Sequence, residues 1–506
     1  MNRAACLAAA WFLVLSCSGA GPEESASDTG ADPVREAVSL FINARTAGGL
    51  DAFIVAVERV RKLAESGQPF FRFLLAVYAA HEPLCKLTDT ARQRYLEEGR
   101  PLMSRHAETG NALAQYLVGV DCELNLAQPE DARRWYERAA MQGQALAQNR
   151  LGLMYYQGQG VAPDDGRAAA YFRQAALQAD MNGEYNLATL YAAGRGVPKD
   201  EELAFHLFRR AAEKGHAHAM NNLGWLYQKG VGVAADPARA AEWYRKAAES
   251  GNADGQFNYG FLCAQGVGVP QDDREAGLWY WRAAEQGHVE AMVSIGMLYR
   301  DGRGLKGDDF KALNWFAKAA EHRHAGAQFF IGQMLEQGRG LPRDTERAFR
   351  WYQKSAQQGY PRAHHALGTL YYRGRGVEKD YVKAAGHFAL AAEKGLASSQ
   401  NNLGMLYLRG EGVERDEKQA AAWFAKAVRQ GVAGAAFNLA QLYEYGRGVD
   451  ASHTKAVQLC KEAALRGHVG AADWLLQNGY TAWAKPHREK KNRDAQVSEG
   501  LEDQPF

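Results

Sequence analysis

Proline, net charge and long apolar runs are all scarce in this sequence. Fourteen prolines among 506 residues exclude a collagen-like chain and a low-complexity chain rich in Gly and Pro. The net charge is only +2, far from the basic excess of proteins that bind phosphate backbones, so we expect no nucleic-acid partner. Beyond residue 30 no stretch reaches the ~18 uncharged apolar residues that a membrane-spanning helix needs. We therefore expect the body of the chain to have no membrane-spanning helix.

The first twenty residues have the pattern of a secretory signal. Arg3 follows the positive α-amine, and residues 4–16 form an apolar segment that is too short to span a bilayer comfortably. The sequence fits two alternative cleavage sites. The run at 14–17 resembles a bacterial lipobox, in which Cys17 becomes the lipidated first residue of the mature chain. The alternative is plain cleavage after Ala20.

Lipidation at Cys17 predicts a protein on the periplasmic side of a bacterial membrane, held there by the lipid anchor only. Residues 18–32 would then form a flexible tether. Similarity to lipoproteins with Ser after the lipidated Cys, as Ser18 is here, favours the outer membrane. Without lipidation, the same signal predicts a secreted or periplasmic protein.

Cysteine is scarce as well, with six residues in the chain. Cys85 and Cys122 lie in segments that look like loops of adjacent repeats, and an oxidising compartment permits a disulfide between them. Two unpaired thiols are the alternative. Cys263 and Cys460 fall on apolar helical positions and are predicted to be core thiols.

Glycine, in contrast, is abundant, because 53 residues make up a little over a tenth of the chain against roughly 7% on average. The excess comes from a repeat whose glycines recur every 36 residues. The first series has Ala at two places and comprises Gly152, Ala188, Gly224, Gly260, Gly296, Gly332, Gly368, Gly404 and Ala440. Nine repeats occupy residues 144–467, with a looser copy at about 108–143 and a half copy at 468–480.

Each repeat is predicted to form two helices, shown here by residues 216–251. Apolar residues at i, i+3 and i+4 around Gly224 indicate a first amphipathic helix, called helix A. Gly230 and Gly232 can take positive φ and turn the chain. Asp236 then caps a second helix, helix B, which carries Trp243 and ends near 251. Equivalent capping residues are Asp164, Asp200, Asp272, Asp308, Asp344, Asp380, Asp416 and Ser452. Stacked copies can bury faces that two isolated helices cannot.

These motifs resemble the Sel1-like repeat, a 36-residue relative of the tetratricopeptide repeat. The resemblance rests on Leu-Gly-x-x-Tyr in helix A, on the Gly-x-Gly-Val corner and on Trp-Tyr-x-x-Ala-Ala in helix B, and it covers about two-thirds of the chain. It implies an all-α fold, a right-handed α/α superhelical solenoid of helix-turn-helix units. It also implies a protein–protein interaction scaffold of the cell envelope. Local departures are Ala179 and Arg323 in place of the final Gly, and Cys263 in place of the helix-A Tyr.

The organisation that follows has five parts. The signal peptide at 1–20 and the tether at 18–32 precede a degenerate helical cap at 33–107. The repeat solenoid covers 108–480, and a polar tail of mixed charge at 481–506 is predicted to be disordered.

By resemblance to tetratricopeptide superhelices, helix A lines a concave groove that binds another protein or peptide. The sixth and tenth residues of each repeat vary there, and several are large and apolar. The candidate protein-binding residues are Trp225, Phe257, Phe261, Met297 and Phe329, with His365, Tyr372, Arg300 and Glu336 as a more polar flank. The alternative is that some of the aromatic residues pack against the next helix and belong to the core. Capture of a host surface protein is a second interpretation within the binding class.

We find no pattern that predicts catalysis, a cofactor or a metal ion. The histidines at the first position of a repeat (His216, His288, His324 and His468) are expected to cap helix A rather than to bind metal. Ser452 and Lys455 have the Ser-x-x-Lys spacing of penicillin-recognising enzymes, and some cysteine-rich relatives of this repeat are associated with β-lactamase activity. Ser452 lies in the register of the capping Asp residues, so a β-lactam-binding enzyme remains the alternative to a non-catalytic scaffold.

Overall fold

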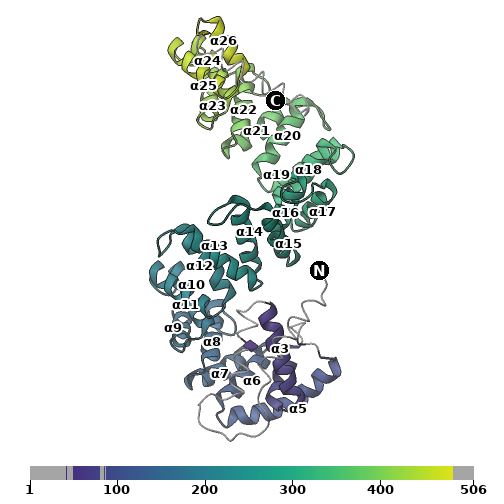
Figure 1. Ribbon diagram of the computed structural model, residues 1–506, viewed down its shortest axis with the longest axis vertical. Coiled ribbons are helices and arrows are strands. Elements are labelled where there is room, and N and C mark those ends of the chain that lie inside the picture. Colours follow the sequence, from purple (N-terminus) through teal and green to yellow (C-terminus); the bar gives the residue numbers. More distant parts are fainter. Residues whose placement is uncertain (1–40, 43–49, 80–84, 86, 482–506) are drawn as a thin grey trace. The chain divides into compact units, whose positions relative to one another are not determined.

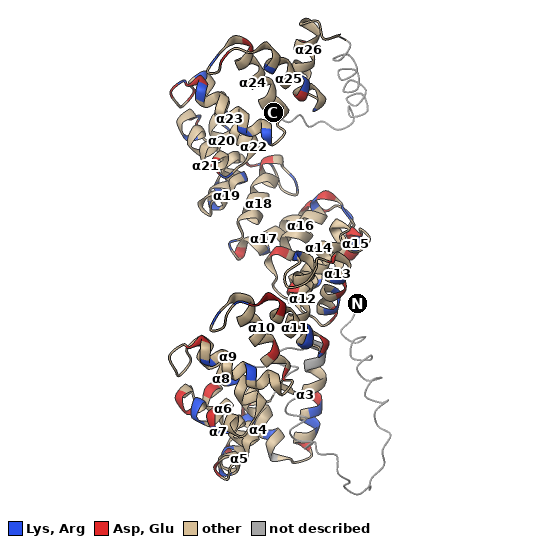
Figure 2. Cartoon of the chain, turned by 90° about the vertical axis from the view of Figure 1, so that its left-hand side faces the viewer, with Lys and Arg blue, Asp and Glu red and all other residues tan. Residues whose placement is uncertain are grey.

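The computed structural model describes residues 41–42, 50–79, 85 and 87–481, which form 24 helices and no strand (Figure 1). Lys, Arg, Asp and Glu occur along the whole series of helices (Figure 2). The predicted signal peptide with Cys17, the predicted tether at 18–32 and the tail beyond 481 lie outside the described residues. None of the described helices combines the length and the apolar character that crossing a lipid bilayer requires.

The expected alternation of helix A and helix B is confirmed in every repeat. Three helices precede the array: α3 (Leu50–Glu65), α4 (Pro69–Tyr78) and α5 (Asp89–Glu108). The A helices are α6 (Ala112–Leu124), α8 (Ala145–Gln157), α10 (Met181–Ala193), α12 (Ala217–Lys229), α14 (Ala253–Gln265), α16 (Val289–Asp301), α18 (Ala325–Gln337), α20 (Pro361–Arg373), α22 (Ala397–Arg409) and α24 (Ala433–Tyr445). The B helices are α7 (Pro129–Met141), α9 (Asp165–Leu177), α11 (Glu201–Glu213), α13 (Pro237–Glu249), α15 (Asp273–Glu285), α17 (Asp309–Glu321), α19 (Thr345–Gln357), α21 (Tyr381–Glu393), α23 (Glu417–Arg429) and α25 (His453–Leu465). The half copy forms α26 (Val469–Gln477).

The glycine corner joins the two helices of a repeat and also connects consecutive repeats. Gly230 ends α12 in the left-handed conformation, and Gly232 follows with φ of 67°. A Cβ on Gly232 would lie 2.2 Å from the backbone oxygen of Glu201, at the start of helix B in the preceding repeat. The corner therefore packs directly on the neighbouring backbone, and only glycine leaves room for that contact.

The predicted caps of helix B are confirmed at all nine positions. The Asp236 carboxylate accepts the backbone N–H of Arg239 at 3.0 Å, and Ser452 occupies the equivalent position of the last full repeat. The other seven are Asp164, Asp200, Asp272, Asp308, Asp344, Asp380 and Asp416. Each cap satisfies a helix-terminal donor that would otherwise lack a partner.

In eight of the ten repeats, helix A carries glycine where it crosses the aromatic ring of its own helix B, and Ala188 and Ala440 are the exceptions. A Cβ on Gly224 would lie 2.7 Å from the Tyr244 ring. The last full repeat has a larger residue, Ala440, on helix A, and a smaller one, the buried Cys460, at the ring position. The two positions thus compensate in volume, as close packing requires.

Two junctions between helix B and the next repeat lack their usual glycine, and the backbone there is strained. Ala179 and Arg323 replace the final glycine of helix B and still take φ of 62° and 60°. A left-handed conformation costs roughly 1–2 kcal/mol for a residue with a Cβ. Tertiary packing therefore imposes this turn at positions where the residue type does not favour it.

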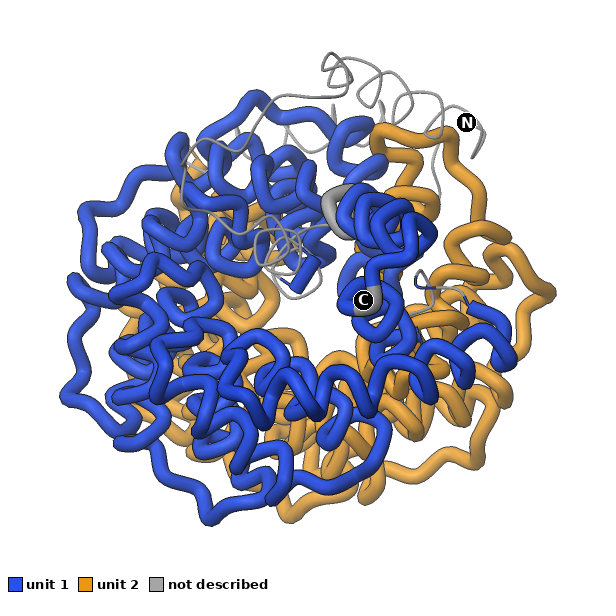
Figure 3. The backbone as a smooth tube through the Cα atoms, turned by 90° about the horizontal axis from the view of Figure 1, so that it is seen from below, with its two compact units in different colours: residues 1–291 blue, residues 292–506 orange. Residues whose placement is uncertain are grey.

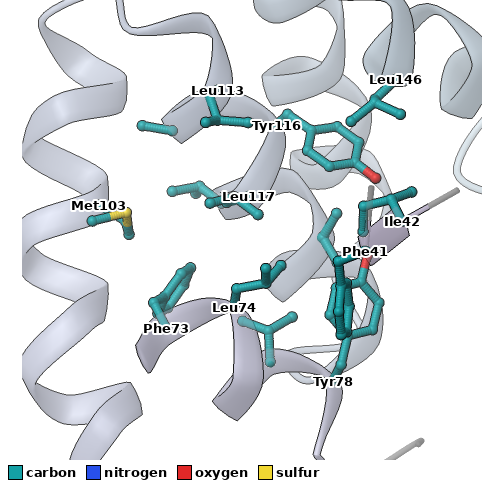
Figure 4. Packing of buried hydrophobic residues seen from close by; sticks show 14 of the residues in the cluster. Phe41, Ile42, Phe73, Leu74, Tyr78, Met103, Leu113, Tyr116, Leu117 and Leu146 are labelled. Atoms are coloured by element: carbon teal, nitrogen blue, oxygen red, sulfur yellow. The ribbon is translucent and has the colours of Figure 1, made fainter. Parts of the chain in front are cut away.

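The chain divides into two compact units, residues 1–291 (unit 1) and 292–506 (unit 2), coloured separately in Figure 3. In unit 1, helices α3–α5 share one hydrophobic core with the first repeats. Phe73, Leu74, Tyr78 and Met103 pack there with Leu117, as Figure 4 shows. The N-terminal helices thereby cover the apolar end of the repeat array in this unit.

Candidate functional site

The four histidines at the first position of a repeat cap helix A, as the sequence predicted. The backbone N–H of Ala219 donates to Nδ1 of His216 at 3.2 Å, and His288, His324 and His468 each accept the equivalent bond at 3.1 Å. Burial lowers the pKa of His216 to about 3, so the ring stays neutral and keeps a lone pair for the cap. Within the described residues, no group of three or more His, Cys, Asp or Glu is arranged to hold a metal ion.

An aromatic or imidazole ring at this first position also packs on the sixth residue of the preceding repeat. The His216 ring lies 4.3 Å from the Tyr185 ring, and the His288 ring lies 4.6 Å from the Phe257 ring. In unit 2 the Phe329 ring packs against Tyr360 at 5.5 Å and against Tyr352 at 5.5 Å. Phe257 and Phe329 are thus packed between repeats, which is the alternative interpretation that the sequence left open for these aromatic residues.

Trp225 and Phe261 remain exposed in unit 1. They occupy the tenth position of consecutive repeats, on α12 and α14, and expose 46% and 44% of their surface. Among the described residues, no ring of the next repeat stacks on Trp225 or Phe261, unlike at the sixth position. Two large apolar side chains on neighbouring A helices are typical of an interaction surface.

A groove of about 1270 Å³ lies along the A helices of unit 2. Four of the predicted site residues, Met297, Phe329, His365 and Tyr372, line it together with the predicted flank residues Arg300 and Glu336. The groove extends over α16, α18, α20 and α22, with the corners that follow α18 and α20. The structure therefore brings together the C-terminal part of the predicted set and leaves Trp225, Phe257 and Phe261 in unit 1.

Seven arginines line this groove, and sequence reasoning identified only Arg300. The full set is Arg300, Arg339, Arg343, Arg362, Arg373, Arg375 and Arg409, against a single acidic residue, Glu336. The even charge balance of the whole chain conceals this local excess. A signal was present in the Gly-Arg-Gly corners at 338–340 and 374–376, where an arginine recurs beside helix A.

Some of these arginines are neutralised by nearby carboxylates. Arg300 pairs with Asp301 at 2.7 Å, which lowers the pKa of that carboxyl group. Arg339 pairs with Asp309 at 2.7 Å and donates to the backbone oxygen of Arg300 at 2.6 Å. Arg409 lies 3.9 Å from Glu411.

Polar side chains on α20 and α22 form the remainder of the groove wall. His365 Nδ1 lies 2.7 Å from the buried hydroxyl of Ser399, and burial lowers the pKa of His365 to about 4. The Tyr372 hydroxyl donates to Glu411 at 3.1 Å, while Arg409 donates to the same hydroxyl at 3.1 Å. Burial and the Glu411 hydrogen bond raise the pKa of Tyr372. These groups offer hydrogen bonds from a neutral imidazole and a neutral phenol.

The predicted Cys85–Cys122 bridge is not formed in the structure. Cys122 is a buried thiol in the last turn of α6, not a loop residue as expected, because the helix continues to Leu124. Burial and the neighbouring Asp121 raise its pKa to about 11. Cys263 and Cys460 are buried thiols within helices, which confirms the prediction for both.

Ser452 and Lys455 have separate structural roles. The Ser452 hydroxyl accepts the backbone N–H of Lys455 at 3.4 Å as the cap of α25. The Lys455 amine lies over the Tyr443 ring, 4.9 Å from its centre. The two side chains are thus engaged by their own repeat.

The family model of the Sel1 repeat matches ten consecutive segments of this chain. They are residues 112–144, 145–180, 182–216, 217–252, 253–288, 289–324, 325–360, 361–396, 397–432 and 433–468. The looser copy that the sequence indicated before residue 144 is therefore a true repeat.

Solved structures give the same result. The chain is 30% identical to c5321, described as a protective antigen present in uropathogenic Escherichia coli strains and displaying an SLR fold, with a TM-score of 0.66. That match covers 89% of this chain and 98% of the other. A Sel1 repeat protein from Oxalobacter formigenes is 34% identical, with a TM-score of 0.51 over 61% of this chain and 90% of the other. No curated protein sequence matches the chain.

Proposed function

The chain belongs to the Sel1 repeat family, and we propose that it is a protein-binding scaffold of the bacterial cell envelope. In this proposal the A helices hold a partner protein or peptide, and the repeats supply a stable frame for that surface. The observation that carries it is the groove of unit 2, which is lined by four of the seven residues that sequence variation marked as a binding surface.

Two features of the helix-A surface support binding of a polypeptide. The groove combines apolar side chains such as Met297 and Met405 with hydrogen-bonding groups such as Gln333 and Thr369. Methionine adapts its shape to different partners, while a few polar groups fix orientation. The exposed Trp225 and Phe261 add an apolar area on unit 1, of the kind that carries much of the binding energy at interfaces.

The test is co-purification from envelope extract, followed by direct binding to the partner identified. We expect Trp225→Ala/Phe261→Ala to reduce recovery through unit 1, and Met297→Ala/Met405→Ala to reduce it through the groove. Phe310→Ala is the matched control, because Phe310 is 68% exposed but lies on helix B. Equal recovery of every partner by all variants would contradict the proposal.

The envelope location rests on the N-terminal sequence. We propose that Cys17 carries a lipid and holds the protein at the periplasmic side of a membrane, with the outer membrane favoured by Ser18. Cys17→Ala should then release the protein from the membrane fraction. A mature N-terminus at Gly21 would contradict lipidation and favour a secreted or periplasmic form.

Exposure on the cell surface is the second candidate within the binding class. The Escherichia coli protein that shares this fold is described as a protective antigen, which favours testing the same exposure here. Protease treatment of intact cells should cleave a surface-exposed chain and leave a periplasmic one intact.

We also propose that the protein has no catalytic activity. The capping role of Ser452 and the position of Lys455 over Tyr443 support this. A fluorescent penicillin should not label the wild-type protein, and labelling that Ser452→Ala abolishes would overturn it.

A further inference from the structure

We propose that the groove of unit 2 binds an extended acidic polypeptide segment, whose carboxylates pair with Arg343, Arg362 and Arg375. This inference rests on the proposed function and specifies the chemistry of the partner. These three arginines make no ion pair within the described residues, whereas arginines at equivalent corners of other repeats do.

In several other repeats, the residue that starts helix B neutralises the arginine or lysine of an adjoining corner. Arg195 pairs with Asp165 at 2.9 Å, and Arg447 pairs with Glu417 at 2.7 Å, each reaching back to the preceding repeat. Glu417 also accepts Arg415 at 2.7 Å from the loop just before its own helix. One carboxylate at this position can thus hold two cations, one from each side.

In the repeat that contributes Arg343, the first residue of helix B is Thr345, whose side chain is uncharged. Arg343 precedes it by two residues, as Arg415 precedes Glu417, and Arg375 follows it by thirty, as Arg447 follows Glu417. Neither guanidinium makes an ion pair or hydrogen bond to another described residue, and both are exposed on the groove. A single residue difference thus leaves two cations available at one end of the A helices.

Arg362 supplies a third cation near the opposite end of α20. It lies in the first turn of this helix, is exposed, and likewise has no ion pair within the part of the chain that the structure describes. A 13-residue helix is about 20 Å long, and an extended chain covers that distance in roughly six residues. Two carboxylates about six residues apart therefore match the spacing of the cations.

The groove floor between these cations offers partners to a peptide backbone. In three repeat pairs an Asn on helix A donates to an Asn of the preceding repeat, as Asn438 does to Asn401 at 3.1 Å. Asn402 has His365 as its preceding-repeat neighbour instead, and His365 is engaged with Ser399. The Asn402 amide lines the groove without such a bond among the described residues, so it can pair with an amide of a bound segment.

The groove suits a carboxylate-bearing peptide better than a nucleic acid. Arginine forks bind carboxylates in two-point geometry, as the Arg339–Asp309 pair does. Nucleic acids need a longer run of cations and exposed aromatic rings on which bases stack. Phe329 is stacked between repeats and Phe388 is buried against helix A, while the half-buried Tyr372 is held by Glu411 and Arg409.

The sharpest test is Thr345→Glu, which introduces the carboxylate that Glu417 supplies elsewhere and leaves every groove residue in place. Binding of a short fluorescein-labelled peptide of Glu, Asp and Leu would be followed by anisotropy. We expect Thr345→Glu to weaken binding about tenfold and Thr345→Gln, its neutral control, to leave it unchanged. Binding should also fall with added salt, since the contacts are charge pairs at a partly exposed surface.

A second set of variants removes the cations directly. Arg343→Gln/Arg362→Gln/Arg375→Gln should weaken binding more than Thr345→Glu, whereas Arg350→Gln/Lys418→Gln/Arg429→Gln, on the B helices, should not. A peptide with Gln and Asn in place of the acids should bind at least tenfold more weakly than the acidic one.

The outcomes separate this inference from the proposed function. Unchanged affinity of Thr345→Glu and of the groove triple variant would overturn the acidic-segment inference, while loss of a co-purified partner in Met297→Ala/Met405→Ala would still support a scaffold. Tighter binding of an oligouridylate than of the acidic peptide would also overturn it, in favour of a nucleic acid.

Discussion

The A helices of unit 1 and unit 2 share one backbone plan and present different chemistry. In unit 1, Asn186 donates to Asn149 at 2.8 Å and Asn258 donates to Asn221 at 2.9 Å, so the amides satisfy one another. Unit 2 keeps one such pair, Asn438 with Asn401, at its C-terminal end. In its first three repeats Val293, Phe329 and His365 replace Asn at the sixth position, and the arginine-lined groove lies there.

The difference shows which residues determine the fold and which determine the chemistry of the helix-A surface. Glycine corners, Asp caps and the glycine-to-ring contact recur in both units. The sixth and tenth residues and the first residue of helix B vary, and they decide whether the A helices present amides, aromatic rings or cations. A repeat frame therefore allows the binding surface to change without a change of fold.

The largest expected effect tests the shared frame. Gly224→Ala in unit 1 and Gly332→Ala in unit 2 both place a Cβ 2.7 Å from a tyrosine ring of helix B. Overpacking of this kind costs about 1–3 kcal/mol, and we expect similar losses in both units. Hydrogen exchange of each unit would measure it, because stability in a solenoid is local.

Gly434→Ala is the control for this pair. Its Cβ would meet nothing within 4 Å, so the change should be neutral or should stabilise α24 by up to about 1 kcal/mol. Losses confined to one unit would show that the two frames differ.

The second prediction separates packed from exposed aromatic residues. Phe257→Ala removes a ring that stacks on His288 and lies 5.7 Å from Tyr280, and should cost about 2–3 kcal/mol. Trp225→Ala should change the free energy of unfolding by less than about 0.5 kcal/mol, since Trp225 is half exposed. Equal losses from both, measured by denaturant unfolding, would remove the distinction between sixth and tenth positions.

Acid should weaken unit 2 more than unit 1. The pKa values of His216 in unit 1 and His365 in unit 2 fall to about 3 and about 4 on folding, so the unfolded chain binds more protons below pH 6.5. Each contributes stability that is lost as pH falls from about 6.5, roughly 2 kcal/mol by pH 5. The pKa of Asp180, in unit 1, is raised to about 6 by burial, so its contribution is present at low pH and is lost as pH rises through 6.

Asp180 therefore offsets part of the acid sensitivity of His216, and the offset is specific to unit 1. Hydrogen exchange at pH 7 and pH 5, corrected for intrinsic rates, would compare the units. His365→Asn should remove part of the pH dependence of unit 2, because Asn occupies the same position at Asn401. An unchanged pH profile would contradict the assignment.

The smallest expected effect is a gain of stability at the strained corners, one in each unit. Ala179→Gly and Arg323→Gly should each add about 1 kcal/mol, because glycine accepts the left-handed conformation without steric cost. Gly251→Ala, at φ of 84°, should lose a similar amount and serves as the converse. Thermal unfolding of the three variants would rank them.

Much of the fold followed from the sequence because its determinants are local. Gly230 and Gly232 turn the chain, Asp236 caps the next helix, and His216 caps the helix before the corner. Each acts within a few residues, so a strict 36-residue period was enough to place 20 paired helices.

The site was less predictable because its determinants link different repeats. The sequence pattern predicts an exposed Phe257, whereas in the structure His288 of the next repeat stacks on its ring. Arg375 and Arg447 look alike in sequence, and only Arg447 has an ion pair, because Glu417 stands thirty residues before it where Thr345 precedes Arg375. Such pairs become visible only when neighbouring repeats are placed side by side.

The sequence by itself determined the helical repeat, its corners and its caps, since these depend on the conformational preferences of single residues and on hydrogen bonds within a turn. Tertiary structure alone decided which aromatic rings are covered and which arginines remain without a carboxylate. Burial and ion pairing are properties of contacts between repeats, and the period that builds every repeat in the same way contains no information about them.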